Sequence, residues 1–144
     1  MKKIAILIVI AVSLYGYFDK NPDLALLFSK QGEADNSAVT SAYKNRKSDV
    51  QVLGSGVVVR NLADDTIGSR HQKFILKLPG GQTLLVSHNI DLAPRINSLR
   101  EGDTVSFYGE YEWNSKGGVV HWTHHDPGGK HVGGWLKHGG VTYQ

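Results

Sequence analysis

Apolar and polar residues alternate with a period of two along most of the chain after residue 50. Successive side chains of a β-strand point to opposite faces, so this alternation predicts strands that bury one face. In the first such segment, Gly54 and Gly56 are typical of the bulge or sharp bend that small barrels need. Five segments show the alternation: residues 50–60, 70–78, 82–88, 104–113 and 119–123.

The connections between these segments indicate how the strands are arranged. The turn Pro79-Gly80-Gly81 joins the second strand to the third, and residues 114–118 join the fourth to the fifth as a hairpin. Residues 89–100 space their apolar side chains for a short helix or a packed loop. Five strands with a helical connection between the third and fourth match the OB-fold. We therefore predict a mainly β fold, a small five-stranded OB-fold-like antiparallel barrel with a short helix between strands 3 and 4; a different small antiparallel barrel would produce a similar pattern.

Residues 1–20 have the pattern of a secretory leader. Lys2 and Lys3 precede an apolar run at residues 4–18, which is short for a membrane span. Cleavage after Ala11-Val12-Ser13 would shorten the apolar region to about seven residues. We therefore expect an exported protein, periplasmic or secreted, with an inner-membrane anchor formed by residues 4–18 as the alternative.

Composition limits the remaining choices. Of the 144 residues, 40% are hydrophobic and 20% charged, which is ordinary for a globular protein. We expect a linker with a short helix at residues 21–49 and one barrel domain with a histidine-rich tail at residues 50–144. From residue 50 onward, nine basic and eight acidic residues leave a net charge of +1, so polyanion binding would require clustered charge. Because the chain has no cysteine, its stability must come from the core rather than from disulfides.

Histidines gather at the C-terminal end, where five of the seven lie in the last 24 residues. Imidazole binds metals and transfers protons near neutral pH. In a regular strand His121 and His125 would lie about 13 Å apart and His124 would point to the opposite face. A shared ion therefore requires the strand to end near Thr123. We predict a candidate site for Mg²⁺, Mn²⁺ or Zn²⁺ formed by His121, His124, His125 and Asp126; the alternative is a polar tail whose histidines bind backbone carbonyls.

A second group of polar residues lies at the start of the second strand. Arg70 and Lys73 are suited to bind phosphate oxygens, and His71 to act as a general acid or base. If the second and third strands pair across their turn, His71 and His88 lie near the same end, with Arg70 nearly opposite Asn89. The alternative is the solvated face of an edge strand. We predict catalytic roles for His71, His88 and His124, and substrate-binding roles for Arg70, Lys73, Asn89 and Tyr108.

Tyr108 joins this set as an aromatic residue on the polar face of the fourth strand, beside Glu110. Exposed aromatic rings provide stacking surfaces for bases in OB-folds. Trp113 and Trp122 are expected to be buried instead, because their strand faces also carry apolar residues. Tyr108 is therefore the aromatic candidate for ligand binding.

Four segments together are similar to an uncharacterised family of small exported bacterial proteins. They are Arg70-His71-Gln72-x-Phe74, His88-Asn89-Ile90-Asp91-Leu92-Ala93-Pro94-Arg95, Gly109-Glu110-Tyr111-Glu112-Trp113 and His121-Trp122-Thr123-His124-His125-Asp126-Pro127. The resemblance extends from residue 50 to the C-terminus. It implies export and a single domain, and it assigns no catalytic residues.

Three functions follow as hypotheses. The first is an exported enzyme that binds and hydrolyses a phosphate-containing ligand, with nucleic acid as the best guess and a divalent ion as a candidate cofactor. The second is a non-catalytic OB-fold module that binds an oligonucleotide, an oligosaccharide or a protein. The third is extracytoplasmic binding of a divalent metal by the tail. A membrane partner is expected only through an uncleaved N-terminal anchor.

Overall fold

The computed structural model describes residues 35–144, so the predicted leader and the first part of the predicted linker lie outside the described residues. Within the described part, no helix has the length and apolarity needed to cross a membrane. The elements are α3 (Ser37–Lys44), β1 (Val50–Asn61), β2 (His71–Lys77), β3 (Thr83–Asn89), β4 (Thr104–Glu112), β5 (Val119–His121), β6 (Trp135–His138) and β7 (Val141–Tyr143).

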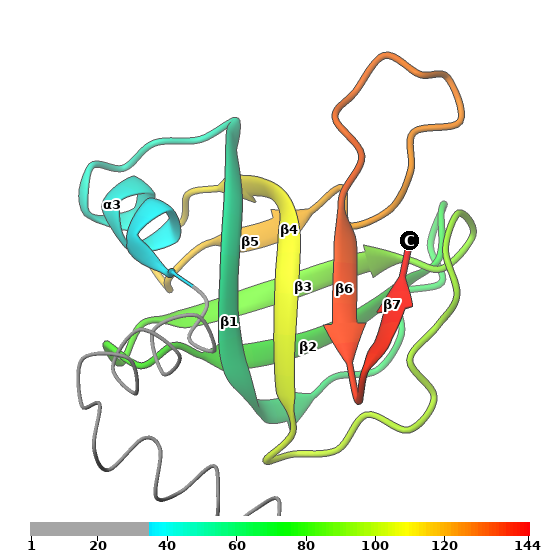
Figure 1. Ribbon diagram of the computed structural model, residues 1–144, viewed down its shortest axis with the longest axis horizontal. Helices are drawn as coiled ribbons and strands as arrows, with labels where there is room; N and C mark the ends of the chain where they lie inside the picture. The colour runs from blue at the N-terminus through cyan, green and yellow to red at the C-terminus, as the bar shows by residue number, and fades with distance from the viewer. Residues whose placement is uncertain (1–34) are drawn as a thin grey trace, which may run out of the picture. The chain divides into compact units, whose positions relative to one another are not determined.

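Strand β1 closes the sheet into a barrel because it pairs with both β2 and β4 (Figure 1). The order around the barrel is β1-β2-β3-β5-β4, and β4 returns to β1. This is the five-stranded OB-fold-like barrel that the sequence predicts. However, β3 and β5 are parallel, so the barrel is mixed rather than wholly antiparallel. A closed ring with an odd number of strands cannot alternate direction throughout, and one parallel pair is unavoidable.

The inner faces of the strands form one apolar core. Along β4 the alternation is unbroken, with Val105, Phe107 and Tyr111 fully buried. Helix α3 adds Val39 and Ala42 to the same core. Each large apolar side chain removed from water contributes about 1.5–3 kcal/mol, so the predicted alternation accounts for most of what holds the barrel together.

The two interior glycines of β1 allow close packing rather than a bulge. A Cβ atom at Gly54 would collide with the ring of Phe107, and one at Gly56 would lie 2.9 Å from the carbonyl oxygen of Lys77. The register irregularity of β1 lies further along, between Val58 and Arg60. The glycines are therefore needed because neighbouring strands approach β1 closely on the inside of the barrel.

The connection between β3 and β4 contains turns instead of the short helix predicted from its sequence. The buried Gln72 side chain donates to the carbonyl oxygen of Ile96 and accepts from its N–H, both at 2.9 Å. The His88 ring bonds to the carbonyl oxygen of Pro94. These side chains form hydrogen bonds with backbone N–H and carbonyl groups that a helix would pair with one another. The segment therefore forms a packed loop.

The C-terminal tail is part of the sheet, although the sequence predicted only a histidine-rich extension. Strand β4 pairs with β5 near its end and with β6 near its middle, so β6 continues the edge that β5 begins. Residues 122–134 form a loop that leaves the sheet between β5 and β6 (Figure 1, orange). At its start Trp122 has a φ of 55°, which turns the chain away from the strand direction.

Candidate functional site

A polar hollow of about 210 Å³ lies on the outer face of the barrel, where β2 begins and β3 and β5 end. It contains three of the histidines that the sequence singled out, and it also contains Asn89. The lining residues are Ser69, His71, Ser87, Asn89, Leu92, His121, Trp122 and His124. The structure therefore brings the histidines of β2, of β5 and of the loop after β5 to one place.

Strand pairing explains the convergence. His71 lies directly opposite Asn89 in the β2–β3 ladder, one position away from the predicted pairing of Arg70 with Asn89. Side chains alternate along a strand, so His71 and Asn89 point outward while Gln72 and His88 point into the core. Strand β5 runs parallel to β3, which places His121 at the same end of the sheet.

In two histidines of the hollow, one ring nitrogen forms a hydrogen bond with a backbone carbonyl. The Nδ1 atom of His71 lies 2.8 Å from the carbonyl oxygen of Ser69, and that of His124 lies 2.6 Å from the carbonyl oxygen of His125. A carbonyl oxygen can only accept, so both Nδ1 atoms carry hydrogen. Each Nε2 is then left to accept a proton when the ring is neutral, or to donate one when the ring is protonated.

His88 lies beneath the hollow and is fully buried. Its Nε2–H donates to the carbonyl oxygen of Pro94 at 3.0 Å, so Nδ1 accepts from the hydroxyl of Thr123 at 2.7 Å. Burial above all, with a contribution from the nearby His124 and His71, lowers the pKa of His88 to about 4, although the hydrogen bond to Pro94 acts in the opposite direction. With both nitrogens occupied and no exposure, His88 does not fit its predicted role as a general acid or base. It holds two loops in place instead.

Of the predicted substrate-binding residues, only Asn89 lines the hollow. The Nε atom of Arg70 donates to Asp91 at 2.7 Å, and 58% of the Arg70 side chain is exposed. Bonds from the backbone N–H and then the side chain of Arg70 lower the pKa of Asp91. Lys73 lies on the same face as the hollow, opposite Ser87.

Tyr108 also lies outside the hollow. Its ring packs beside Trp135 of β6, with the ring centres 6.1 Å apart. The amine of Lys137 lies over the Trp135 ring, 4.4 Å from its centre. The predicted aromatic candidate therefore belongs to a separate patch on β4 and β6.

The predicted metal site does not form, because its residues have other partners. The Asp126 carboxylate accepts from the backbone N–H groups of Gly128, Lys130 and His131 at 2.8–2.9 Å. These bonds lower the pKa of Asp126, that from His131 most of all. His125 is exposed, and His124 turns into the hollow. Asp126 thus organises the loop, and of the predicted ligands only His121 belongs to a cluster with metal-binding geometry.

That cluster consists of Glu110, Glu112 and His121. One ligand atom from each lies within 4.8 Å of the others, which in residues 35–144 is true of no other group of three. Both glutamates project outward from β4, and His121 of β5 lies opposite Glu110. The alternation along the sequence predicts only that both glutamates lie on the polar face of a strand. A Glu-x-Glu pair facing a histidine across the 114–118 hairpin was the signal that could have identified them.

The 122–134 loop places a second histidine beside this cluster, in contact with Glu110 alone. The Nε2 atom of His131 contacts Glu110 Oε2 directly, while its Nδ1–H donates to the carbonyl oxygen of Val132 at 2.8 Å. The bond to Val132 and the Glu110 carboxylate both raise the pKa of His131. The ring also stacks on Trp122, with centres 3.9 Å apart and planes within 9°. Burial and the neighbouring Asp49 raise the pKa of the Glu112 carboxyl.

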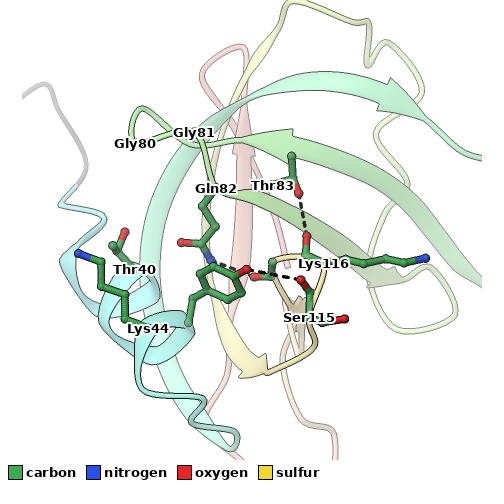
Figure 2. Close-up of a pocket in the computed structure, with 10 residues that line it drawn as sticks. Thr40, Lys44, Gly80, Gly81, Gln82, Thr83, Ser115 and Lys116 are labelled. Carbon is green, nitrogen blue, oxygen red and sulfur yellow. Dashed lines mark hydrogen bonds between the residues drawn. The ribbon is translucent and has the colours of Figure 1, made fainter.

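A larger cavity of about 390 Å³ lies at another place on the barrel, between α3, the β2–β3 turn and the β4–β5 loop (Figure 2). Its side chains mainly hold these loops together. Gln82 Nε2 donates to the carbonyl oxygen of Gly117 at 2.9 Å, and Thr83 Oγ1 to that of Lys116 at 2.8 Å. The lining includes no histidine, aspartate or glutamate. We therefore place the candidate chemistry in the smaller hollow.

Comparison with known proteins adds little chemistry. One family model matches residues 23–144, and its description, protein of unknown function, names no activity. No curated protein matches the chain. The match confirms the expected resemblance to an uncharacterised family, whereas export of the protein stays a prediction.

Proposed function

The chain belongs to the DUF3465 family of proteins of unknown function. From its outer-face hollow we propose that it binds a phosphate-containing ligand, and that the preferred ligand is a single-stranded nucleic acid. The observation that carries the proposal is the pair of imidazoles, His71 and His124, whose Nε2 atoms are left for a ligand. When protonated, both would donate to phosphate oxygens. The β2–β3 face is also the surface on which OB-folds bind oligonucleotides.

Other groups around the hollow suit the same ligand. The Oδ1 atom of Asn89 accepts from the backbone N–H of Asp91 at 2.9 Å, which leaves the amide nitrogen to donate. Ser69 and Ser87 add hydroxyl groups to the lining. Lys73, opposite Ser87, adds a positive charge on the same face. The arrangement offers several hydrogen-bond donors and one lysine on the same face, which favours an anionic ligand over a neutral one.

Hydrolysis of a phosphodiester is the second candidate, because two imidazoles of the hollow have an Nε2 atom left for a ligand. In this reaction one Nε2 accepts the proton of an attacking water as the oxygen bonds to phosphorus. The bond from phosphorus to the leaving oxygen breaks, and the protonated second imidazole gives its proton to that oxygen. His71 and His124 are the candidates for these roles, and His88 is not.

Binding can be tested with a fluorescently labelled single-stranded oligonucleotide at pH 6 and low ionic strength, with EDTA present. His124→Gln should weaken binding about ten- to a hundredfold, because a hydrogen bond to a charged group contributes about 1.5–3 kcal/mol. His125→Gln is the matched control, since His125 is its exposed neighbour. Affinity should also fall as salt increases.

The outcomes separate the hypotheses. Binding without cleavage would identify a non-catalytic module, whereas cleavage that is lost in His71→Gln and His124→Gln but kept in His88→Gln would identify a hydrolase. Equal affinity in the His124→Gln and wild-type proteins, or preference for a neutral oligosaccharide, would refute the proposed ligand class.

We also propose that the protein acts outside the cytoplasm, on the basis of its first 20 residues. Lys2, Lys3 and the apolar run at residues 4–18 support export, and the alternatives are a cleaved leader and an anchor. Cell fractionation together with the mass of the mature chain would distinguish them. Recovery of the full-length chain in the cytoplasm would contradict export.

A further inference from the structure

Strands β4 and β5 place three metal-binding side chains together on the outer face of the barrel. Glu110 and Glu112 project from the same face of β4, and His121 stands opposite Glu110 on β5. The Nε2 atom of His121 lies 3.5 Å from Glu112 Oε1. Ligand atoms of a tetrahedral zinc ion, bound at about 2.0–2.2 Å, lie roughly 3.4 Å apart. The observed separation therefore has the size that one shared ion requires.

The Nε2 atom of His121 is the clearest sign that something else binds here. The atom is buried, and although it lies 3.5 Å from Glu112 Oε1 it makes no hydrogen bond among the described residues. A buried polar atom left without a partner costs about 1–3 kcal/mol, and such atoms in native proteins call for an explanation. An ion bound between His121 and the two carboxylates would supply the missing partner.

His131 of the 122–134 loop lies outside this group of three but holds one of its carboxylates in place. Because the Nδ1–H of His131 donates to the Val132 carbonyl, its Nε2 is the atom that contacts the Glu110 carboxylate. The bond to Val132 and the Glu110 carboxylate raise the pKa of His131, which favours a proton shared between the His131 and Glu110 side chains. Stacking on Trp122 further fixes the ring.

The surrounding charge also favours a cation. Besides burial, which has the larger effect, the nearby Asp49 raises the pKa of the Glu112 carboxyl, and it adds a third carboxylate to the surroundings. In the part of the chain that the structure describes, the ion-pair partners of Glu110 and Glu112 are histidines rather than lysines or arginines. The cluster therefore holds more negative charge than its own side chains neutralise.

We propose that Glu110, Glu112 and His121 bind one divalent transition-metal ion, with Zn²⁺ the ion that this ligand set fits best. One imidazole and two carboxylates are nitrogen and oxygen ligands typical of zinc, and three protein ligands leave a fourth position for water. Mg²⁺ and Ca²⁺ prefer oxygen ligands alone. His121 also lines the phosphate-binding hollow, so the ion would lie at its wall. Metal binding does not depend on the proposed ligand, and each can fail without the other.

Calorimetric titration of the full, EDTA-treated and dialysed chain with Zn²⁺ tests the site. We expect one ion per chain and no competition from millimolar Mg²⁺. His121→Gln and Glu110→Gln should each weaken binding about a hundredfold, as expected when a ligand of a four-coordinate ion is lost. His125→Gln, in the same histidine-rich segment but outside the cluster, should bind Zn²⁺ like the wild type.

A second measurement covers variants that fold poorly. Zn²⁺ should raise the midpoint of thermal unfolding of the wild type and of His125→Gln, and should leave that of His121→Gln unchanged. Absorption by Co²⁺ in place of Zn²⁺ should show tetrahedral coordination in the wild type and in His125→Gln, but not in His121→Gln. Absence of Zn²⁺ binding by the wild type, unchanged affinity in His121→Gln, or an equal loss in His125→Gln would each overturn the proposal.

Discussion

Replacing His88 by glutamine should remove a large part of the acid sensitivity of folding. The imidazole is fully buried and its pKa is lowered to about 4. In the unfolded chain a histidine has a pKa of about 6.5. The unfolded state therefore takes up a proton as the pH falls through 6.5, while the folded state does so only near 4. Acidification between these values must favour unfolding.

The size of the effect follows from the difference between the two pKa values. One unit corresponds to about 1.4 kcal/mol, so the wild type should lose about 3 kcal/mol of its free energy of unfolding through His88 alone. The loss should begin near pH 6.5, be complete near pH 4, and be absent above pH 7. That is a large share of a total stability of about 5–15 kcal/mol.

Urea unfolding followed by tryptophan fluorescence, at several pH values from 7.5 to 4.5, measures this contribution. Glutamine can keep the N–H donated to the Pro94 carbonyl, but it does not titrate. The stability difference between wild type and His88→Gln should therefore shrink by about 3 kcal/mol on acidification. The contributions of the other histidines to the pH dependence of stability, including that of His131 with its raised pKa, cancel in this difference because both proteins contain them. A difference that is the same at every pH would refute this account of His88.

Three further predictions follow from single side chains. Gln72→Leu should lower the free energy of unfolding by about 3 kcal/mol in urea denaturation, because the N–H and carbonyl of Ile96 lose their buried partners. Gly54→Ala should lower the free energy of unfolding by about 1–3 kcal/mol, because the added methyl group crowds the core. Gly80→Ala is the control and should change the melting temperature little, because nothing lies within 4 Å of its Cβ position. Equal effects of the two substitutions would contradict the packing argument. Asp126→Ala should make the three amides that its carboxylate binds exchange hydrogen about tenfold faster. The lowered pKa of Asp126 means that the wild-type loop should loosen in the same way only as the pH falls below about 4.

Inward and outward positions could be predicted wherever a strand is long enough to show its alternation. Each strand of a small barrel has one face in the core, so buried residues occur at every second position of β2, β3 and β4. The same pattern placed His88 on the face of Leu84 and Val86, which is the core face. The alternation thus already indicated a buried, structural histidine, and the catalytic assignment of His88 overlooked it.

The candidate sites depended on contacts between distant parts of the chain. The outer-face hollow exists because β3 and β5 run in parallel, and the cluster of Glu110, Glu112 and His121 because β4 and β5 pair Glu110 with His121. Strands of three or four residues, such as β5, β6 and β7, contain too few positions to show a period.

Local sequence therefore determined which face of each long strand is buried, since one strand buried on one side is enough to impose that pattern. Which polar side chains meet was decided by strand pairing and by the return of the 122–134 loop. Strand register and loop conformation depend on interactions summed over the whole barrel. The sequence of a single segment therefore does not determine which strand it pairs with.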